Sequence, residues 1–359
     1  MELKVTTKTN QYPIIIENNF DGLLSAFENT GLIGRKLCIV SDSNVAPLYL
    51  DKITDMFKGS FIKVVNYIIP AGETNKNLDT IRDMYGFFVQ EQLDRRSVLV
   101  ALGGGVVGDI TGFAAATYVR GIPFVQVPTT LLAQVDSSVG GKTGVDFNGH
   151  KNMVGAFYQP HFVYINTSVL ETLPKREFAA GMAEAVKYGY IIDKSYLKYI
   201  ADNSEAIKAL EHSAMAEVVY GSCKCKAFVV DRDEKETGLR EILNFGHTFG
   251  HAVETLSGFK LIHGECVAIG MMAGLYFSMK RGNITAEELA SAEELLKYFD
   301  LPVRVEGLVV EDIFKQMFYD KKTKDGKLNI VILNEVGSAY TEKNASDDEV
   351  IEAIKYIVE

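Results

Sequence analysis

Three of the six histidines lie in one short segment, LNFGHTFGHAVETLSGFKLIHGE, and their spacing is typical of a metal site. His247 and His251 are four residues apart and would share one face of a helix, and His263 begins the next helical segment. Together with a carboxylate they have the composition of a catalytic zinc site, which keeps one position open for water or substrate. Spacing alone does not decide which of the histidines are ligands.

Two carboxylates are candidates for completing this set. Glu184 lies in an alanine-rich helical segment, three residues before Lys187, and Glu254 lies three residues after His251. The alternative is that His247 and His251 are ordinary core histidines of a tightly packed helix pair. Because three of the six histidines fall in one segment, we favour the metal site.

The stretch LVALGGGVVGDITG contains a glycine pattern that suits a nucleotide. Gly103, Gly105 and Gly108 fit G-x-G-x-x-G, which lets backbone amides approach a pyrophosphate at a helix N-terminus. Such glycines also serve tight strand–helix turns that bind nothing, so the motif alone leaves both interpretations open. The usual ribose-binding acid about 20 residues downstream is missing. Asp42 and Asn44 follow an earlier strand instead, which predicts a sheet of non-standard order.

Basic residues close to these motifs suit an anionic ligand. The net charge of -10 argues against a general nucleic-acid or acidic-membrane surface, so anions must be bound by locally placed Lys and Arg. Lys142, Lys151 and Asn152 share the glycine-rich segment GGKTGVDFNGHKN, which cannot be a regular helix. Arg240 precedes His247 by seven residues and could form a fork for a carboxylate. We therefore expect a small, doubly anionic, hydroxylated substrate.

The elements that must position these residues change character along the chain. In the first half, the strand-like runs KLCIVSD, FIKVVNYIIP, VLVALGG and FVQVP alternate with helix-like segments such as 75–92 and 106–118. This alternation predicts a parallel sheet with helices packed on it. The first residues, LKVTTKTN and YPIIIE, are predicted to form a separate pair of strands.

Beyond residue 174 the pattern is mostly helical. Three runs carry helical periodicity: REFAAGMAEAVKYGYII, EAIKALEHSAMAEVVYGSCKCKAFVV and TAEELASAEELLKYF. Thr285 and Glu288 predict a capping box, and LNIVIL is the single strand-like run. The sequence therefore predicts an α/β domain over residues 1–174 and a mostly α-helical domain over residues 175–359.

No targeting or membrane segment is expected. The N-terminal residues lack the basic end and long apolar run of a signal peptide, and CVAIGMMAGLYFSM is too short to span a bilayer. The four cysteines show no disulfide or zinc framework. We expect a cytoplasmic protein that binds neither nucleic acid nor membrane.

An ordered set of motifs resembles the 3-dehydroquinate synthase family over essentially the whole chain. The motifs are SDSNV, AGETNKNL, LGGGVVGDITGFAAATYVRG, VPTTLLAQVDSSVGGKTGVDFNGHKNMVGAFYQP, LPKREFAAGMAEAVKYG, DEKETGLREILNFGHTFGHAVE, HGECVAIGM and DKK. The resemblance implies a Rossmann-like NAD-binding domain followed by a helical domain that binds metal and substrate. It also implies a homodimer.

The resemblance assigns roles residue by residue. It implies that Glu184, His247 and His263 hold zinc or another divalent ion such as cobalt, with His251 nearby as a group that supports the ligands or handles a proton. The implied NAD-binding residues are Asp42, Asn44, Glu73, Lys76, Gly104, Gly105, Val106, Val107, Gly108, Asp109, Thr129, Thr130, Lys142, Lys151, Val169 and Thr172. Asp109 is expected to point toward the nicotinamide ribose or ring.

The implied substrate contacts are Arg120, Lys142, Lys151, Asn152, Lys226, Arg240, Asn244 and Lys322, with Lys322 preferred to Lys321 and Arg120 supplied by a second subunit. The residues implied in catalysis are Asp136, Lys142, Glu184, Lys187, Lys226, Arg240, Asn244, His247, His251 and His263.

The implied activity is that of a lyase in the shikimate pathway of aromatic amino acid biosynthesis. It converts 3-deoxy-D-arabino-heptulosonate 7-phosphate to 3-dehydroquinate through transient oxidation by NAD, β-elimination of phosphate, reduction and intramolecular aldol closure. The alternatives are another sugar phosphate cyclase, a metal-dependent polyol dehydrogenase of the glycerol dehydrogenase group, and a non-catalytic nucleotide sensor.

Overall fold

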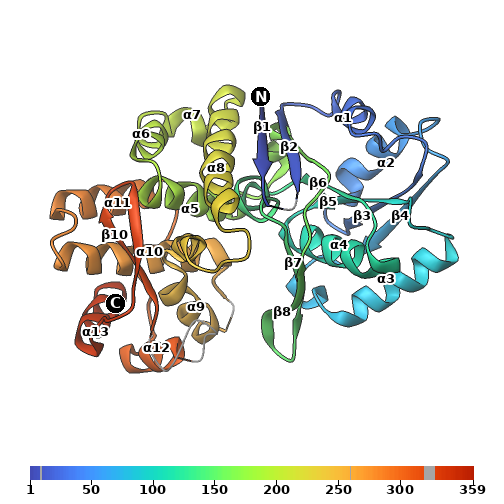
Figure 1. Cartoon of the computed structure of the whole chain (residues 1–359). Helices are drawn as coiled ribbons and strands as arrows, with labels where there is room; N and C mark the ends of the chain where they lie inside the picture. Colours follow the sequence, from blue (N-terminus) through green and yellow to red (C-terminus); the bar gives the residue numbers. More distant parts are fainter. Residues whose placement is uncertain (9, 259, 319–327) are drawn as a thin grey trace. The chain divides into compact units, whose positions relative to one another are not determined.

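The computed structural model describes residues 1–8, 10–258, 260–318 and 328–359, which form two compact units (Figure 1). The first unit contains Met1–Leu173 and Met215–Glu234, and the second contains Pro174–Ala214 and Lys235–Glu359. The first is built on a mostly parallel sheet and the second is mostly helical. The predicted fold class is therefore confirmed.

The first unit contains a seven-stranded sheet with the order β1-β2-β9-β6-β5-β3-β4. All neighbouring strands are parallel except β1, which is antiparallel to β2. The strands are β1 (Glu2–Thr6), β2 (Gln11–Glu17), β3 (Lys36–Asp42), β4 (Lys63–Ile69), β5 (Val98–Gly103), β6 (Phe124–Pro128) and β9 (Val163–Asn166). The predicted N-terminal strand pair exists, but it is not separate, because β2 also hydrogen-bonds to β9 and so extends the main sheet.

Helices cover both faces of this sheet, as its apolar strands require. Leu37 and Ile39 of β3 belong to the apolar cluster packed by α1 (Leu23–Asn29) and α2 (Ala46–Met56). The alternate β3 residues, Cys38 and Val40, belong to the cluster on the other face. That face is packed by α3 (Leu78–Gln90) and α4 (Gly105–Thr117).

The glycine-rich segment after β6 forms an antiparallel hairpin of β7 (Lys142–Phe147) and β8 (His150–Phe157). The sequence excluded a helix here but did not predict the strands. Short helical turns connect the remaining elements of this unit. They are η1 (Glu73–Asn75), η2 (Tyr118–Arg120), η3 (Ala133–Ser137) and η4 (Thr167–Thr172).

The predicted helical run over 205–230 is two helices, α7 (Ser204–Lys208) and α8 (His212–Arg232). Leu210 adopts a left-handed backbone with φ 58°, which ends the first helix. Residues 215–234 pack with the first unit, whereas the predicted boundary at 174 placed them with the second. Their contacts explain this, since the Cys223 thiol donates to the carbonyl of Gln134 at 3.3 Å.

The described residues of the second unit form helices and one hairpin. Its elements are α5 (Lys175–Ile191), α6 (Lys194–Asp202), α7, η5 (Leu239–Asn244), α9 (His247–Leu256), α10 (His263–Lys280), α11 (Ala286–Tyr298), α12 (Val310–Met317), β10 (Ile330–Glu335), β11 (Ser338–Glu342) and α13 (Asp347–Ile357). The predicted capping box of Thr285 and Glu288 begins α11. The predicted lone strand, β10, pairs with β11, which the sequence did not reveal.

The apolar run within α10 is a buried helix, as predicted. Among the residues that the structure describes, no helix is both long and apolar enough to cross a membrane.

Candidate functional site

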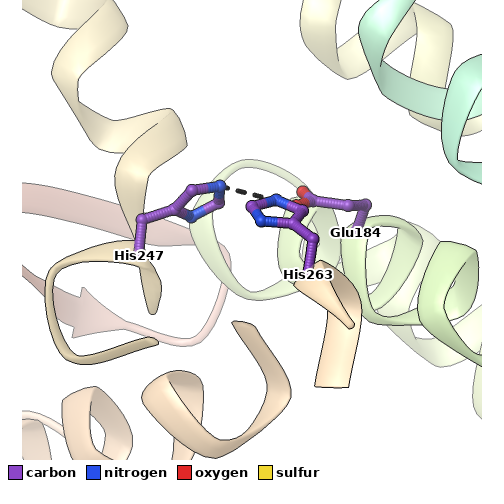
Figure 2. Close-up of side chains that lie close together, drawn as sticks. All are labelled: Glu184, His247 and His263. Carbon is purple, nitrogen blue, oxygen red and sulfur yellow. Dashed lines mark ion pairs between the residues drawn. The ribbon is translucent and has the colours of Figure 1, made fainter. Parts of the chain in front are cut away.

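Glu184, His247 and His263 converge in the second unit (Figure 2). The Oε1 atom of Glu184 lies 3.5 Å from His247 Nε2 and 3.3 Å from His263 Nε2. The Glu184 side chain is 1% exposed and His263 is 34% exposed, so the group lies at the boundary between core and surface. The structure thus brings together the three predicted metal ligands.

The donor set and its spacing fit a divalent metal ion. A tetrahedral centre with metal–ligand bonds of about 2.1 Å separates neighbouring ligand atoms by roughly 3.4 Å, close to both measured distances. The Nδ1 atom of His247 lies 3.1 Å from the carbonyl of Phe245. A proton on Nδ1 makes that bond and leaves Nε2 as the ligand atom, as metal-binding histidines require.

Close helix packing explains why these ligands meet. Helices α9 and α10 touch through their backbones, because a Cβ on Gly270 would lie 1.9 Å from the carbonyl oxygen of Gly246. Gly246 itself has φ 79°, which favours glycine, and it directly precedes the first residue of α9, His247. His263 is likewise the first residue of α10. Both imidazoles therefore stand at helix starts.

A second group of possible ligands shares one of these histidines. His251, Glu254 and His263 also offer ligand atoms within 4.8 Å of one another. The rings of His251 and His263 have centroids 5.9 Å apart. The structure therefore keeps both of the carboxylates that the sequence suggested, Glu184 and Glu254, close to the histidines.

Lys187 is the buried cation beside this centre. Its Nζ forms an ion pair with Glu184 Oε2, one helical turn along α5, and its side chain is 2% exposed. Two of the predicted substrate-binding residues, Arg240 and Asn244, lie in η5. Arg240 is 1% exposed, and the Asn244 amide donates to Glu236 Oε1 at 3.1 Å.

In the first unit, most of the predicted NAD-binding residues follow the carboxyl ends of neighbouring parallel strands, where α/β sheets bind ligands. Asp42 ends β3, Gly104 and Gly105 follow β5, Thr129 and Thr130 follow β6, and Val169 and Thr172 lie in η4 after β9. The chain passes from β3 to β4 on one side and then to β5 on the other. Asp42 and the glycine turn therefore flank the point where strand order reverses.

The glycine turn fits a pyrophosphate. A Cβ on Gly104 would lie 3.0 Å from Thr130 Cγ2, and one on Gly108 would lie 2.7 Å from Gln126 Oε1, so α4 packs tightly on the sheet. An α-helix leaves its first N–H groups without intrahelical acceptors, and its N-terminus favours negative charge. In α4 these are the amides of Gly105, Val106 and Val107.

Asp109 on α4 lies beside a buried lysine. Lys76 Nζ donates to Asp109 Oδ2 at 2.7 Å and to Asn152 Oδ1 at 2.6 Å. Burial opposes the charge of Lys76, but the carboxylates of Asp109 and Glu73 raise the pKa of Lys76 above its usual value. Burial raises the pKa of Asp109, and Lys76 counteracts that rise. Lys76 thus links a predicted NAD residue to a predicted substrate residue, a contact that the sequence did not reveal.

Lys226 and Asp136 form a second polar pair in this unit. Lys226 Nζ lies 2.8 Å from the Asp136 carbonyl oxygen and 2.9 Å from Asp136 Oδ1, which ties α8 to η3. Lys142 and Lys151 lie on the β7–β8 hairpin with exposed side chains, and Arg120 is exposed at the end of η2. Lys321 and Lys322 lie outside the described residues.

Two family models match consecutive parts of the chain: 3-dehydroquinate synthase N-terminal over residues 66–180 and 3-dehydroquinate synthase C-terminal over residues 181–323. The 3-dehydroquinate synthase of Acetivibrio thermocellus is 48% identical over 332 residues, which is 92% of each chain.

Solved structures share the fold across almost the whole chain. One is 2-deoxy-scyllo-inosose synthase with carbaglucose-6-phosphate, NAD+ and Co2+, at a TM-score of 0.89 and 24% identity over 99% of both chains. Another is 2-epi-5-epi-valiolone synthase from Streptomyces hygroscopicus with NAD+ and Zn2+, at a TM-score of 0.89 and 25% identity over 98% of both chains. The sequence matches are more specific than the shared fold, and they show that the chain belongs to the 3-dehydroquinate synthase family.

Proposed function

We propose that this chain converts 3-deoxy-D-arabino-heptulosonate 7-phosphate to 3-dehydroquinate and phosphate, with NAD+ and a divalent metal ion as cofactors. The observation that carries the proposal is the 48% identity to a 3-dehydroquinate synthase over 92% of both chains. Side chains of both units support it, because the grouped Glu184, His247 and His263 and the basic residues of the β7–β8 hairpin suit the metal ion and the phosphate that the reaction needs.

Glu184, His247 and His263 would hold the metal ion, with zinc preferred and cobalt as the alternative. A bound ion of this kind supplies Lewis acidity that lowers the pKa of a coordinated alcohol. Two contacts support these ligands. The Phe245 carbonyl orients the His247 ring, and the Lys187 ammonium balances the charge of the Glu184 carboxylate. His251 shares the helix α9 with His247 and would handle a proton close to the same centre.

The carboxyl edge of the sheet in the first unit would bind NAD+. The bound dinucleotide supplies a hydride acceptor that is regenerated within each cycle. The amides that begin α4 would face its pyrophosphate, and Asp42 would accept hydrogen bonds from ribose hydroxyls. Asp109, with its charge balanced by Lys76, would lie toward the nicotinamide end.

Basic and polar side chains would orient the substrate and stabilise its departing phosphate. Lys142, Lys151 and Asn152 on the β7–β8 hairpin would bind the phosphate, whose negative charge grows as the C–O bond breaks. Arg240 would form a two-pronged contact with the carboxylate of the substrate, and Asn244 would hydrogen-bond to one of its hydroxyl groups.

Lys226 is held by Asp136 and would contribute a further cation to the substrate site. The positive charge of these side chains must be local, because the chain as a whole carries a net charge of -10.

A cytoplasmic homodimer is part of the proposal. Val119 and Arg120 both have left-handed backbone conformations, with φ 42° and 70°, and Gly121 follows with φ 114°. Strained turns of this kind are concentrated at functional sites. The exposed Arg120 would reach the substrate phosphate of a second copy.

One assay tests the function against its alternatives. The purified chain is given the heptulosonate phosphate, Zn2+ and a catalytic amount of NAD+, while phosphate release, dehydroquinate and NADH absorbance are followed. We expect phosphate and dehydroquinate in equal amounts with no accumulation of NADH. Stoichiometric NADH from a polyol would favour a dehydrogenase, turnover of a different sugar phosphate would favour another cyclase, and no turnover at all would favour a nucleotide sensor.

A further inference from the structure

Arg176 links the beginning of α5 to the beginning of α10. Its Nε and Nη2 atoms donate to the two carboxylate oxygens of Glu265, each at 2.7 Å. Glu265 also accepts the backbone N–H of Ile262 at 2.9 Å, so it caps α10 at the same time. Arg176 Nη2 further donates to the carbonyl of Lys260 at 2.8 Å, in the segment that leads into α10. One guanidinium therefore holds both the segment that precedes α10 and the first turn of α10.

The backbones of the two helices touch one residue earlier on α10. A Cβ on Gly264 would lie 2.1 Å from the carbonyl oxygen of Ala180 and 2.5 Å from its Cα. Arg176, Ala180 and Glu184 are four residues apart, so they follow one face of α5. The consecutive residues His263, Gly264 and Glu265 on α10 meet this face at Glu184, Ala180 and Arg176.

We infer that Arg176 and Glu265 are positioning residues for the metal centre: their ion pair fixes the first turn of α10 on α5 and so sets His263 opposite Glu184. The 3.3 Å separation of Glu184 Oε1 and His263 Nε2 depends on how far α10 is rotated and shifted along α5. The tight Gly264 contact sets the distance between the helices, and the two-pronged ion pair sets the rotation. The inference rests on the proposed metal site, but not on the proposed reaction.

The other end of α10 offers a matched control for a purely stabilising role. Arg281, directly after α10, donates through Nε and Nη2 to Glu349 at 2.5 and 3.0 Å. This pair has the same chemistry and ties the same helix to α13. It lies a whole helix length from His263, about 27 Å at 1.5 Å per residue. Its loss should loosen α10 without moving the metal ligands.

The test measures metal binding and coordination geometry instead of turnover. Metal-stripped full-length chain is titrated with Co2+ against a chelator, and the ligand-field absorption of the bound ion is recorded. We expect Arg176→Met and Glu265→Gln each to weaken Co2+ binding about tenfold and to alter the spectrum, which is the lower end of the loss caused by removing groups that orient metal ligands. Arg176→Lys should fall between these variants and wild type, because lysine keeps the charge but not the fork. Arg281→Met should keep the wild-type affinity and spectrum.

Each outcome decides between the hypotheses. Wild-type Co2+ affinity and spectrum in Arg176→Met would overturn the positioning role, as would an equal loss in Arg281→Met. Should Arg176→Met fail to fold, Arg176→Lys and Glu265→Gln carry the same comparison. Co2+ binding by wild type that His263→Ala leaves unchanged would overturn the proposed metal site itself, and the positioning role with it.

Discussion

Lys76 and Asp109 form a 2.7 Å ion pair between Nζ and Oδ2, which joins a buried lysine to the helix that follows the glycine turn. An aspartate in a pyrophosphate-binding motif would repel the ligand if its charge were unbalanced. Lys76 supplies the balancing charge and also donates to Asn152 on the β7–β8 hairpin at 2.6 Å. The residues predicted to bind cofactor and phosphate are therefore coupled through one ammonium group.

Replacing Lys76 with methionine should destabilise the first unit and weaken NAD+ binding. The Lys76 side chain is 6% exposed and Asp109 is 19% exposed, so the substitution leaves a largely buried carboxylate without this cation. We expect a loss of about 3 kcal/mol in the free energy of unfolding, measured with urea. The double variant Lys76→Met/Asp109→Asn should recover part of this loss. Additive losses in the double variant would mean that the two side chains are not coupled.

Alanine substitutions should separate the two groups of metal ligands. If Glu184, His247 and His263 hold the ion, His247→Ala and His263→Ala should lose bound zinc, and His251→Ala should retain it. NAD+ binding should persist in all three variants, because the predicted NAD-binding residues lie in the first unit. Metal analysis and calorimetric NAD+ titration measure both outcomes. Zinc loss in His251→Ala with retention in His247→Ala would assign the site to the second group.

Local features of the candidate site could be predicted from the sequence. Helix α10 begins at His263, as expected, and the four-residue spacing puts His247 and His251 on one helix. The carboxylate ligand cannot be identified in the same way. Spacing leaves both Glu184 and Glu254 open, because it carries no information about contacts between distant segments, and only the family resemblance selects Glu184.

The structural features that the sequence does not reveal depend on tertiary contacts. The β7–β8 hairpin is held by backbone contact between glycine-rich strands, since a Cβ on Gly155 would lie 2.3 Å from the Thr143 carbonyl oxygen. Its sequence lacks the apolar alternation that marks a strand. The break before α8 falls at Leu210, where no glycine or proline signals it. The Arg176–Glu265 pair joins segments far apart in the chain, although Glu265 at the third position of a helix is typical of a cap.

The Arg281–Glu349 pair should make stability depend on pH in acid. Hydrogen bonds from Arg281 lower the pKa of Glu349 to about 2. A carboxyl group with a depressed pKa in the folded state contributes stability above its unfolded pKa and loses that contribution as the pH falls through the folded pKa. Because the two side chains are 34% and 37% exposed, solvent screens their attraction and the pair stabilises the fold by much less than the lowered pKa alone implies. We therefore expect Glu349→Gln to reduce stability by about 0.5 kcal/mol at pH 7, with the difference from wild type closing between about pH 4.5 and pH 2.

Urea unfolding at a series of pH values measures this difference. The single oxygen of glutamine can still cap α13, so the substitution removes the charge and the two-oxygen contact with Arg281 while keeping the cap. Glu352→Gln is the control, because Glu352 and its partner Lys280 are more than half exposed and 3.4 Å apart. A difference that persists unchanged at pH 2 would show that the pair does not set the titration of Glu349.

Lys187 should stabilise the folded chain most strongly when no metal ion is bound. Its ammonium is a buried counter-charge of Glu184, whose side chain is 1% exposed, so Lys187→Met removes that positive charge from beside the carboxylate in the metal-free chain. A bound divalent ion restores the missing positive charge, and binding to the folded state alone stabilises it. Zn2+ should therefore raise the melting temperature of Lys187→Met by more than that of wild type, measured by calorimetry with Zn2+ and with chelator.

Glu184→Gln/Lys187→Met is the control, and it should show little stabilisation by Zn2+, since its carboxylate ligand is gone. Equal shifts in wild type and Lys187→Met would show that Lys187 does not balance the charge of Glu184.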